Sequence, residues 1–278
     1  MITFPCCKIN LGLNVVARRP DGYHDIETVF YPVPLYDALE IKKMNEDFPS
    51  DVGCDIKVTG NTLGNLPDEE NIVVKAYNLL ATDFDLPRIH AHLYKRIPSQ
   101  AGLGGGSADG AFMIRLLDER FRLNMGIAEM ERYAARLGAD CPFFITAETA
   151  YATGIGDILQ PADNASGNLD GYHLAIVKPE VSVSTREAYQ MLTPKKPAKC
   201  CRDIVRQPIE TWRNELTNDF EGPVFRMHPE IGAIKDALYD MGALYAQMSG
   251  SGSAVFGIFK EITESVDTLK EDLLWVTL

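Results

Sequence analysis

The 278-residue sequence has no run of about 18 apolar residues, so no transmembrane helix is expected. Residues 1–10 lack a basic stretch followed by an apolar one, and we expect no signal peptide there. Basic residues are also scarce: 27 Lys and Arg stand against 39 Asp and Glu, and the formal net charge is -12. A surface of that sign repels phosphate backbones and anionic lipids, so we expect neither nucleic acid nor a membrane as a partner.

The six cysteines form no C-x-x-C pair. The two vicinal pairs, Cys6–Cys7 and Cys200–Cys201, do not have the spacing of zinc ligands. Without a secretion signal, reduced structural thiols are the simplest interpretation, and a cytoplasmic location is expected. The sequence leaves the oligomeric state and the ligands of any metal open.

Apolar periodicity predicts an α+β fold that is richer in strands in its first part. Alternation with period two predicts strands over residues 3–16, 25–33, 37–42, 53–59 and 88–97. Helical spacing predicts helices from residue 71 and over 107–121 and 127–137. A polar loop is expected at 161–171. Beyond it we expect strands at 172–178 and 243–248, helices near 185–192, 202–213 and 229–240, and an apolar run at 254–259.

The strongest functional signal is residues 98–108, PSQAGLGGGSA, which we call the glycine loop. It lies between a strand pattern and a helix pattern. Consecutive glycines let several N–H groups point toward one place, and no side chain blocks a close approach. The helix that follows adds unpaired N–H donors and the positive end of its dipole. A flexible turn is the alternative, but the context favours a phosphate cradle, in which Ser107 can bind a phosphate or its Mg²⁺.

Other nucleotide-binding patterns are absent from the sequence. There is no G-x-x-x-x-G-K-[ST] run, and Ser107 stands where a G-x-G-x-x-G pattern needs its third glycine. The H-R-D and D-F-G signatures of protein kinases are missing as well. The cradle therefore belongs to none of these three classes.

Three weaker signals accompany the glycine loop. Lys8 and Asn10 share one face of a predicted strand, where a solvated face is the alternative. Asp140 lies among small and apolar residues, so it is either a turn aspartate or a buried carboxylate that needs a partner such as Lys8. Residues 249–253, SGSGS, which we call the serine loop, form either a second turn over phosphates or a plain loop.

These stretches, in this order, resemble the superfamily of galactokinase, homoserine kinase, mevalonate kinase and phosphomevalonate kinase. The glycine loop matches its P-x-x-x-G-L-G-S/G-S/G-S-A motif, and the likeness extends over residues 5 to about 259. Within the superfamily, the likeness is greatest to members that act on a cytidine-diphosphate-linked sugar alcohol. The stretches that indicate this are residues 8–11, 19–24, 104–106, 138–140 with 142–144, 218–221 and 248–253.

The resemblance implies a two-domain α+β fold with the active site between the domains. We expect an N-terminal domain over residues 1–160, which carries the glycine loop, and a C-terminal domain over 161–278. The implied activity is phosphorylation of a hydroxyl on a small cytidine-diphosphate sugar alcohol, with ATP as donor and Mg²⁺ on its phosphates. Two alternatives stay open: a homoserine or mevalonate type of kinase, and a non-catalytic relative that senses a sugar or a nucleotide.

The resemblance also implies roles for single residues. Lys8 and Asp140 correspond to the catalytic pair. The substrate contacts are Asn10 and Thr185, with Tyr23 and Tyr189 as two walls around the cytosine and His24 at its edge. The ATP contacts are Asn71, Lys95, Pro98, Gly102, Leu103, Gly104, Gly105, Gly106, Ser107 and Ala108.

Several positions depart from the family pattern, among them the two after Ser107. Ala108 and Asp109 follow Ser107 where the family often has Ser and Asn. At Asp109 the sequence leaves two alternatives open, namely repulsion of phosphate and proximity to Mg²⁺.

Overall fold

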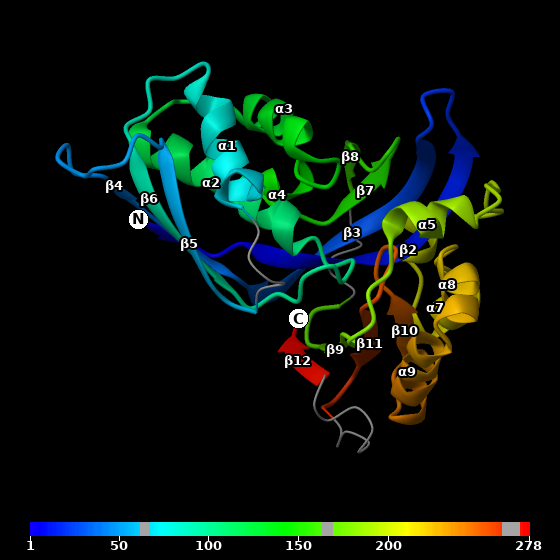
Figure 1. Cartoon of the computed structure of the whole chain (residues 1–278). Coiled ribbons are helices and arrows are strands. Elements are labelled where there is room, and N and C mark those ends of the chain that lie inside the picture. The colour runs from blue at the N-terminus through cyan, green and yellow to red at the C-terminus, as the bar shows by residue number, and fades with distance from the viewer. Residues whose placement is uncertain (62–66, 163–168, 263–272) are drawn as a thin grey trace. The chain divides into compact units, whose positions relative to one another are not determined.

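A computed structural model describes residues 1–61, 67–162, 169–262 and 273–278 (Figure 1). The chain forms two compact units, and each is described by itself. The first unit comprises Met1–Cys7, Leu35–Ser99 and Gly104–Ala147, and the second comprises Lys8–Pro34, Gln100–Leu103 and Glu148–Leu278. The chain therefore crosses from one unit to the other several times. The expected domains 1–160 and 161–278 would require only a single crossing, after residue 160. That division stays a prediction.

The first unit is built on a four-stranded sheet. Its strands, in spatial order, are β1 (Ile2–Thr3), β4 (Ala38–Lys43), β6 (Ile89–Lys95) and β5 (Cys54–Gly60). β5 and β6 are parallel, and the connection between them contains η1 (Asp68–Glu70) and α1 (Ile72–Ala81), as a parallel pair requires. α1, α2 (Gly105–Phe121) and α3 (Ile127–Leu137) lie on one face of this sheet (Figure 1). Leu39, Ile41 and Leu93 are buried in the sheet.

The second unit holds most of one sheet and all of another. The strands of the first, in spatial order, are β2 (Cys6–Arg18), β3 (His24–Tyr36), β7 (Ala150–Thr153) and β8 (Ile158–Pro161). The strands of the other are β10 (Tyr245–Met248), β11 (Val255–Phe259), β9 (His173–Val177) and β12 (Leu273–Thr277), all antiparallel to their neighbours.

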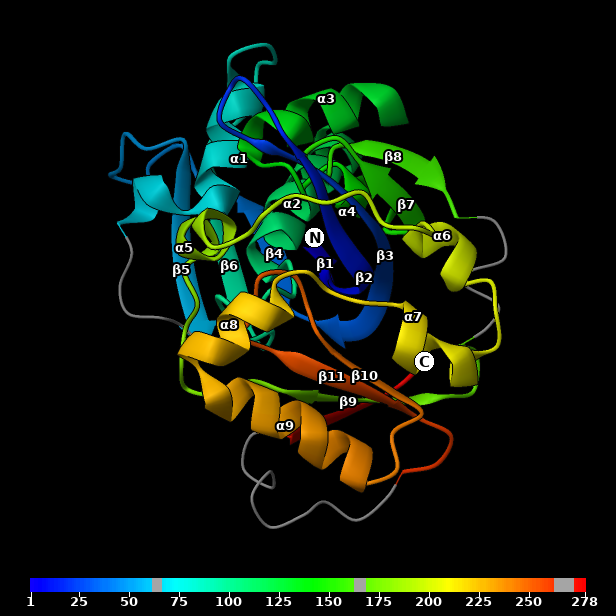
Figure 2. The same cartoon turned by 90° about the vertical axis from the view of Figure 1, so that its right-hand side faces the viewer.

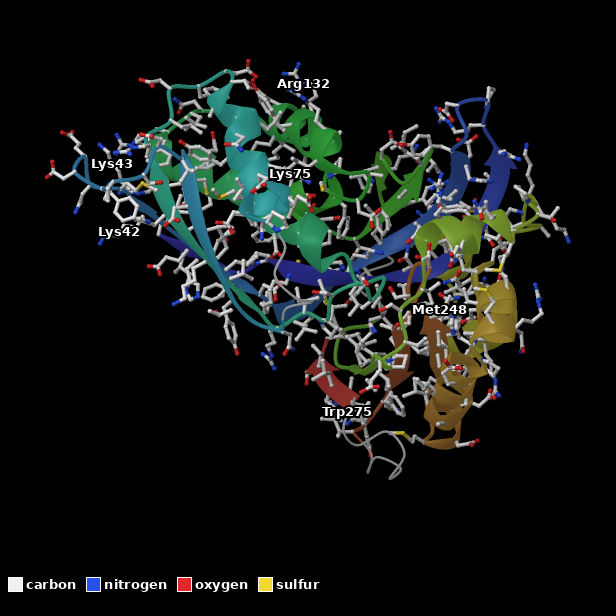
Figure 3. All side chains as sticks on the ribbon, viewed as in Figure 1. Lys42, Lys43, Lys75, Arg132, Met248 and Trp275 are labelled. Carbon is white, nitrogen blue, oxygen red and sulfur yellow. The ribbon has the colours of Figure 1, made fainter. Side chains whose placement is uncertain are left out.

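Helices pack on the second of these sheets. α8 (Glu221–Met227) and α9 (Pro229–Asp240) lie beside β10 and β11 (Figure 2). Ile231 and Leu238 of α9 are buried in one apolar cluster with Met248 of β10. At β12, Trp275 packs against Phe259 with ring centroids 5.0 Å apart; Met248 and Trp275 are labelled in Figure 3.

The predicted α+β class is confirmed, and most predicted elements lie within a few residues of the observed ones. One prediction is wrong. Instead of a helix over 202–213, the chain forms α6 (Cys201–Ile204), a 3₁₀ turn at Ile209–Thr211 and α7 (Trp212–Glu215). Pro208 explains the break, because it has no N–H to donate and disfavours the helical conformation of the residue before it.

Several short elements escaped prediction. The strands β7, β8 and β12 have only four or five residues each, and β8 is largely exposed. An alternation of apolar and polar residues is hard to recognise over so few positions. α4 (Phe143–Thr146) and α5 (Thr185–Gln190) complete the elements. Of the expected loop 161–171, residues 163–168 lie outside the described part. No helix in the described ranges has both the length and the apolarity needed to cross a bilayer.

A buried carboxylate joins α6 to the sheet of β2, β3, β7 and β8. Glu27 Oε1 accepts hydrogen bonds from Asn14 Nδ2 at 3.0 Å and from the backbone N–H of Cys201 at 3.1 Å. Glu27 Oε2 accepts one from the hydroxyl of Tyr151 at 2.9 Å. Burial, together with this bond, raises the pKa of Tyr151, so its hydroxyl stays a donor. All three donors are neutral.

We expect Glu27→Gln to leave stability unchanged or raised, within about 1 kcal/mol, because the amide can serve all three groups without burying a charge. Its oxygen can accept from Asn14 and Cys201, and its nitrogen can donate to the Tyr151 oxygen. Glu27→Ala leaves three buried donors unsatisfied, and we expect it to lower the free energy of unfolding by about 3 kcal/mol. Urea denaturation of both variants checks this, and equal losses in the two would contradict it.

Candidate active site

Lys8 and Asn10 lie side by side on β2, and both are buried. Lys8 Nζ donates to Asn10 Oδ1 at 2.7 Å and to the carbonyl oxygen of Gly102 at 3.0 Å. It also lies 5.1 Å from the ring centroid of Phe30. Asn10 Nδ2 donates to Thr28 Oγ1 at 3.0 Å. The alternative of a solvated strand face is therefore wrong, whereas the catalytic and substrate-binding roles stay predictions.

The serine loop packs against the glycine loop at Gly102. Ser249 Oγ donates to the Gly102 carbonyl at 2.9 Å, and Ala254 N donates to the carbonyl of Ala101 at 3.1 Å. Gly102 has φ +74°, and a Cβ there would lie 2.0 Å from the Ser249 carbonyl oxygen. Both observations require glycine at this position. A role for residues 249–253 over phosphates stays a prediction.

Asn218 holds the serine loop from the other side. Its Nδ2 donates to the carbonyls of Met248 at 2.7 Å and Gly250 at 2.8 Å. Its Oδ1 accepts from the N–H of Phe220 at 2.9 Å. Sequence reasoning noted residues 218–221 only as part of the resemblance and gave Asn218 no role. No local pattern marks it, because its sequence neighbours Thr217 and Asp219 are polar.

The aromatic residues of the expected cytosine site lie in the second unit. His24 stacks on Tyr189, with ring centroids 4.9 Å apart and an interplanar angle of 16°. The ring of Phe220 meets that of Tyr189 edge to face, with centroids 4.8 Å apart and an interplanar angle of 87°. Tyr23 is 62% exposed. His24 thus lies against a face of Tyr189, so a base on that face would have to displace the imidazole. The sandwich of a base between Tyr23 and Tyr189 stays a prediction.

Thr185 is at the first position of α5 and is exposed. Its Oγ1 lies 2.8 Å from Ser251 Oγ, within hydrogen-bond distance. Ser253 Oγ donates to the carbonyl of Val181 at 2.5 Å. Two bonds therefore join the serine loop to the segment that leads to Tyr189. The predicted contact of Thr185 with the substrate is untested.

The start of α2 has the features of an anion cradle. Gly104 has φ +72° and is the N-cap of the helix, where a glycine offers no side chain to cap the first N–H groups. A Cβ at Gly105 would lie 2.8 Å from Ile97 Cγ2, whereas one at Gly106 would meet no atom of the described residues within 4 Å. Gly106 is also exposed. The backbone at Gly106 is therefore open to a ligand, while Gly105 is explained by packing.

The other predicted contacts of the loop have protein neighbours. Ala108 is buried in α2, and the Leu103 carbonyl accepts from Lys8 N at 2.9 Å. Ser107 forms a hydrogen bond with the side chain of Cys141. Burial raises the pKa of this thiol to about 12. Pro98 is partly buried after β6. Contacts of these four residues with ATP stay predictions.

Two residues expected near the nucleotide base already have partners. Asn71 caps α1, since its Oδ1 accepts from Val73 N at 2.9 Å. Lys95 ends β6 with its ammonium between the carboxylates of Asp37 and Asp109. Neither placement tests a contact with ATP.

Asp140 is partly buried in the turn between α3 and α4. It belongs to the first unit and Lys8 to the second, so their pairing stays a prediction, as does a site between domains. Within the ranges that the structure describes, no three His, Cys, Asp or Glu side chains are grouped so that they could hold a metal ion.

Comparison with known families finds two matches. The model described as GHMP kinases N terminal domain matches residues 71–148, and the one described as GHMP kinases C terminal matches residues 202–270. Both fall within the part of the chain over which the motifs of the superfamily were recognised, apart from the last residues of the second match.

Individual proteins are similar over nearly the whole chain. A protein of Bacteroides fragilis named 4-diphosphocytidyl-2-C-methyl-D-erythritol kinase is 52% identical over 259 residues, which are 93% of this chain and 92% of that protein. One of the same name from Parabacteroides distasonis is 49% identical over 263 residues, 95% of this chain and 93% of its own. A crystal structure of 4-(cytidine 5'-diphospho)-2C-methyl-D-erythritol kinase has a TM-score of 0.77 and 30% identity, covering 93% and 90% of the two chains.

The difference between Gly105 and Gly106 yields a test of the phosphate cradle. We expect Gly106→Val to weaken ATP binding roughly tenfold or more. The methyl groups of the valine would fill the space that the phosphate must enter to reach the backbone N–H groups. Its melting temperature should stay near that of the wild type. Gly105→Val should instead lower the melting temperature, because Ile97 has to move.

Gly222 supplies the control, because it also lies in a helix and a Cβ there would meet only Arg226 Nη1, at 3.8 Å. Gly222→Val should leave both the ATP affinity and the melting temperature close to those of the wild type. Calorimetric titration with ATP and thermal melts measure both effects. Wild-type ATP affinity in Gly106→Val would contradict the assignment of the cradle.

Proposed function

Because the chain belongs to the GHMP kinase family, we propose that it transfers the terminal phosphoryl group of ATP to the 2-hydroxyl of 4-diphosphocytidyl-2-C-methyl-D-erythritol. This reaction belongs to the non-mevalonate biosynthesis of isoprenoid precursors. The observation that carries the proposal is the similarity, along nearly the whole chain, to relatives named for this substrate. The proposed substrate is a small molecule.

Phosphoryl transfer requires little covalent chemistry of a protein, and positioning and charge stabilisation dominate. We assign the phosphates of ATP to the glycine loop, where the exposed backbone at Gly106 and the uncapped start of α2 offer N–H donors. The anchored Gly102 supports this loop, since Lys8 and Ser249 both donate to its carbonyl. The cytidyl group is assigned to Tyr23, His24 and Tyr189.

Asp140 is the proposed general base, which accepts the proton of the substrate hydroxyl. Lys8 is proposed to stabilise the negative charge that develops on the reacting oxygens. Its ammonium is held by Asn10 and by a backbone carbonyl, so it is pre-oriented and needs little reorganisation during the reaction. Asn10 is proposed to orient the substrate beside it.

We further propose that Mg²⁺ accompanies ATP. Mg²⁺ bound with a nucleotide usually keeps several waters and is held by phosphate oxygens with one or two protein groups. The Ser107 hydroxyl, at the start of α2, is the protein donor that we assign to it. Such an ion, when bound, neutralises charge on the phosphates.

The cytoplasm is the proposed site of action. All six cysteines are free. Burial raises the pKa of Cys6 to about 11 and that of Cys54 to about 12, so both stay protonated thiols at neutral pH. Unreactive structural thiols are the form expected in a reducing compartment.

A coupled assay of ADP release tests the function. We expect turnover with the cytidyl substrate and none with homoserine or mevalonate. Asp140→Asn should lower the turnover rate by ~10²–10⁴-fold while ATP binding is retained, because asparagine keeps the shape but cannot accept the proton. ADP release only with homoserine or mevalonate would replace the proposed substrate, and binding without turnover in the wild type would indicate a sensing protein. More than a tenth of wild-type activity in Asp140→Asn would mean that Asp140 is not the base.

The exposure of Tyr23 makes it the cleanest test of cytidyl recognition. We expect Tyr23→Ala to raise the Michaelis constant for the cytidyl substrate roughly threefold to tenfold, the equivalent of about 0.5–1.5 kcal/mol of stacking. The constant for ATP and the melting temperature should stay unchanged. Tyr189→Ala should also lower the melting temperature, because Tyr189 packs against Phe220.

Tyr94 is the matched control, because it is 50% exposed on β6 of the other unit. Tyr94→Ala should leave both Michaelis constants unchanged. His24→Ala should in addition reduce the preference for the cytidyl substrate over its uridyl analogue, since a polar contact discriminates more strongly than stacking does. Parallel changes for ATP and the cytidyl substrate in Tyr23→Ala would exclude the aromatic wall.

A further inference from the structure

Lys95 is placed unlike the other lysines of the first unit. Lys42, Lys43 and Lys75, labelled in Figure 3, are exposed. Lys95 is only 8% exposed, at the end of β6. A lysine is seldom buried to this degree unless its charge is paired. The placement therefore calls for an account of what the ammonium does inside the protein.

The ammonium bridges two carboxylates that come from different elements. Lys95 Nζ donates to Asp37 Oδ2 and, at 2.6 Å, to Asp109 Oδ2. Asp37 immediately precedes β4, and Asp109 lies one turn into α2. Both aspartates are buried. The three side chains thus connect the beginning of β4, the end of β6 and the beginning of α2.

Asp37 also holds the backbone that leads into the glycine loop. Its Oδ1 accepts from the N–H groups of Arg96 at 2.5 Å and Ile97 at 2.8 Å. These two residues directly precede the loop. On the other side of the loop, Asp109 ties α2 to the same ammonium, and a Cβ at Gly105 would lie 3.5 Å from Lys95 Nζ, an ordinary contact distance. Both ends of the loop are therefore anchored on the same charged cluster.

The burial of Asp109 argues against both alternatives that the sequence left open for it. The residue is 2% exposed and pairs with Lys95. Burial raises the pKa of Asp109, and the positive charge of Lys95 opposes that rise. The pKa of Lys95 is raised because Asp109 and Asp37 outweigh the effect of burial. The carboxyl group is thus enclosed and paired with Lys95 through Oδ2, while its buried Oδ1 accepts no hydrogen bond from the described residues. Such an enclosed group is not at the surface of the loop, where it would repel phosphate or meet a solvated Mg²⁺.

We propose that Lys95, Asp37 and Asp109 are positioning residues that hold both ends of the glycine loop in the geometry that binds the phosphates of ATP, and that Lys95 does not touch the nucleotide. This inference rests on the proposed function only in taking ATP as the ligand of the loop. It replaces the contact between Lys95 and ATP that the resemblance implied.

Rescue by neutral side chains distinguishes positioning from direct contact. Lys95→Met leaves two buried carboxylates without their cation, and we expect a lower melting temperature and roughly tenfold weaker ATP binding, because the loop loses its geometry. The triple variant Asp37→Asn, Lys95→Met, Asp109→Asn keeps the shape of the cluster without charge. The amide oxygen that this variant carries at position 37 can still accept from the N–H groups of Arg96 and Ile97. We expect the variant to bind ATP within about threefold of the wild type, because the loop geometry returns.

Calorimetric titration with ATP alone measures the affinity, so the result does not depend on the sugar-alcohol substrate. A wild type that binds ATP but fails to phosphorylate the cytidyl compound would contradict the proposed function and leave this test valid. Lys75→Met, which removes an exposed lysine from α1, is the control and should bind ATP as the wild type does.

Two results would overturn the proposal. One is a triple variant that melts like the wild type but binds ATP as weakly as Lys95→Met does, since the lysine itself would then be the contact. The other is wild-type ATP affinity in Lys95→Met. If Lys95→Met fails to fold, the triple variant decides alone, because its affinity is near that of the wild type only if the ammonium is dispensable for binding.

Discussion

The carbonyl oxygen of Gly102 is the acceptor on which much of the second unit's part of the site depends. Lys8 Nζ and Ser249 Oγ both donate to it, so one backbone atom joins β2, the glycine loop and the serine loop. A buried ammonium requires hydrogen-bond acceptors, and a buried carbonyl requires donors. Here the ammonium of Lys8 and the carbonyl of Gly102 serve as partners for each other. Asn218 extends the arrangement, because it binds the serine loop from the opposite side.

The glycines of the glycine loop serve different physical purposes. Gly102 and Gly104 adopt positive φ angles, and Gly102 also lies against the Ser249 carbonyl. Gly105 lets α2 approach Ile97. Gly106 alone of these four has neither a positive φ nor a neighbour that a Cβ would meet. A glycine-rich pattern therefore combines folding requirements with functional ones, and only the structure separates them.

Prediction from the sequence succeeded where the signal was local and repeated. The helices over 107–121 and 127–137 and the strands 53–59 and 88–97 agree closely with α2, α3, β5 and β6. The prediction of one helix over 202–213 is wrong because the apolar spacing continues across Pro208, where a helix cannot continue undisturbed. The role of Lys95 was taken from the resemblance, and no sequence pattern reveals that an ammonium lies between two carboxylates 58 and 14 residues away.

The sequence alone determined the α+β class, the glycine loop between strand and helix, and the family. These depend on backbone sterics, apolar period and motif spacing, which act over a few residues. The tertiary structure decided which polar groups are buried together. Glu27 meets Cys201 across 174 residues, and Ser249 meets Gly102 across 147. Such contacts arise because a folded core must satisfy every polar group that it removes from water, and which groups meet depends on how distant segments pack.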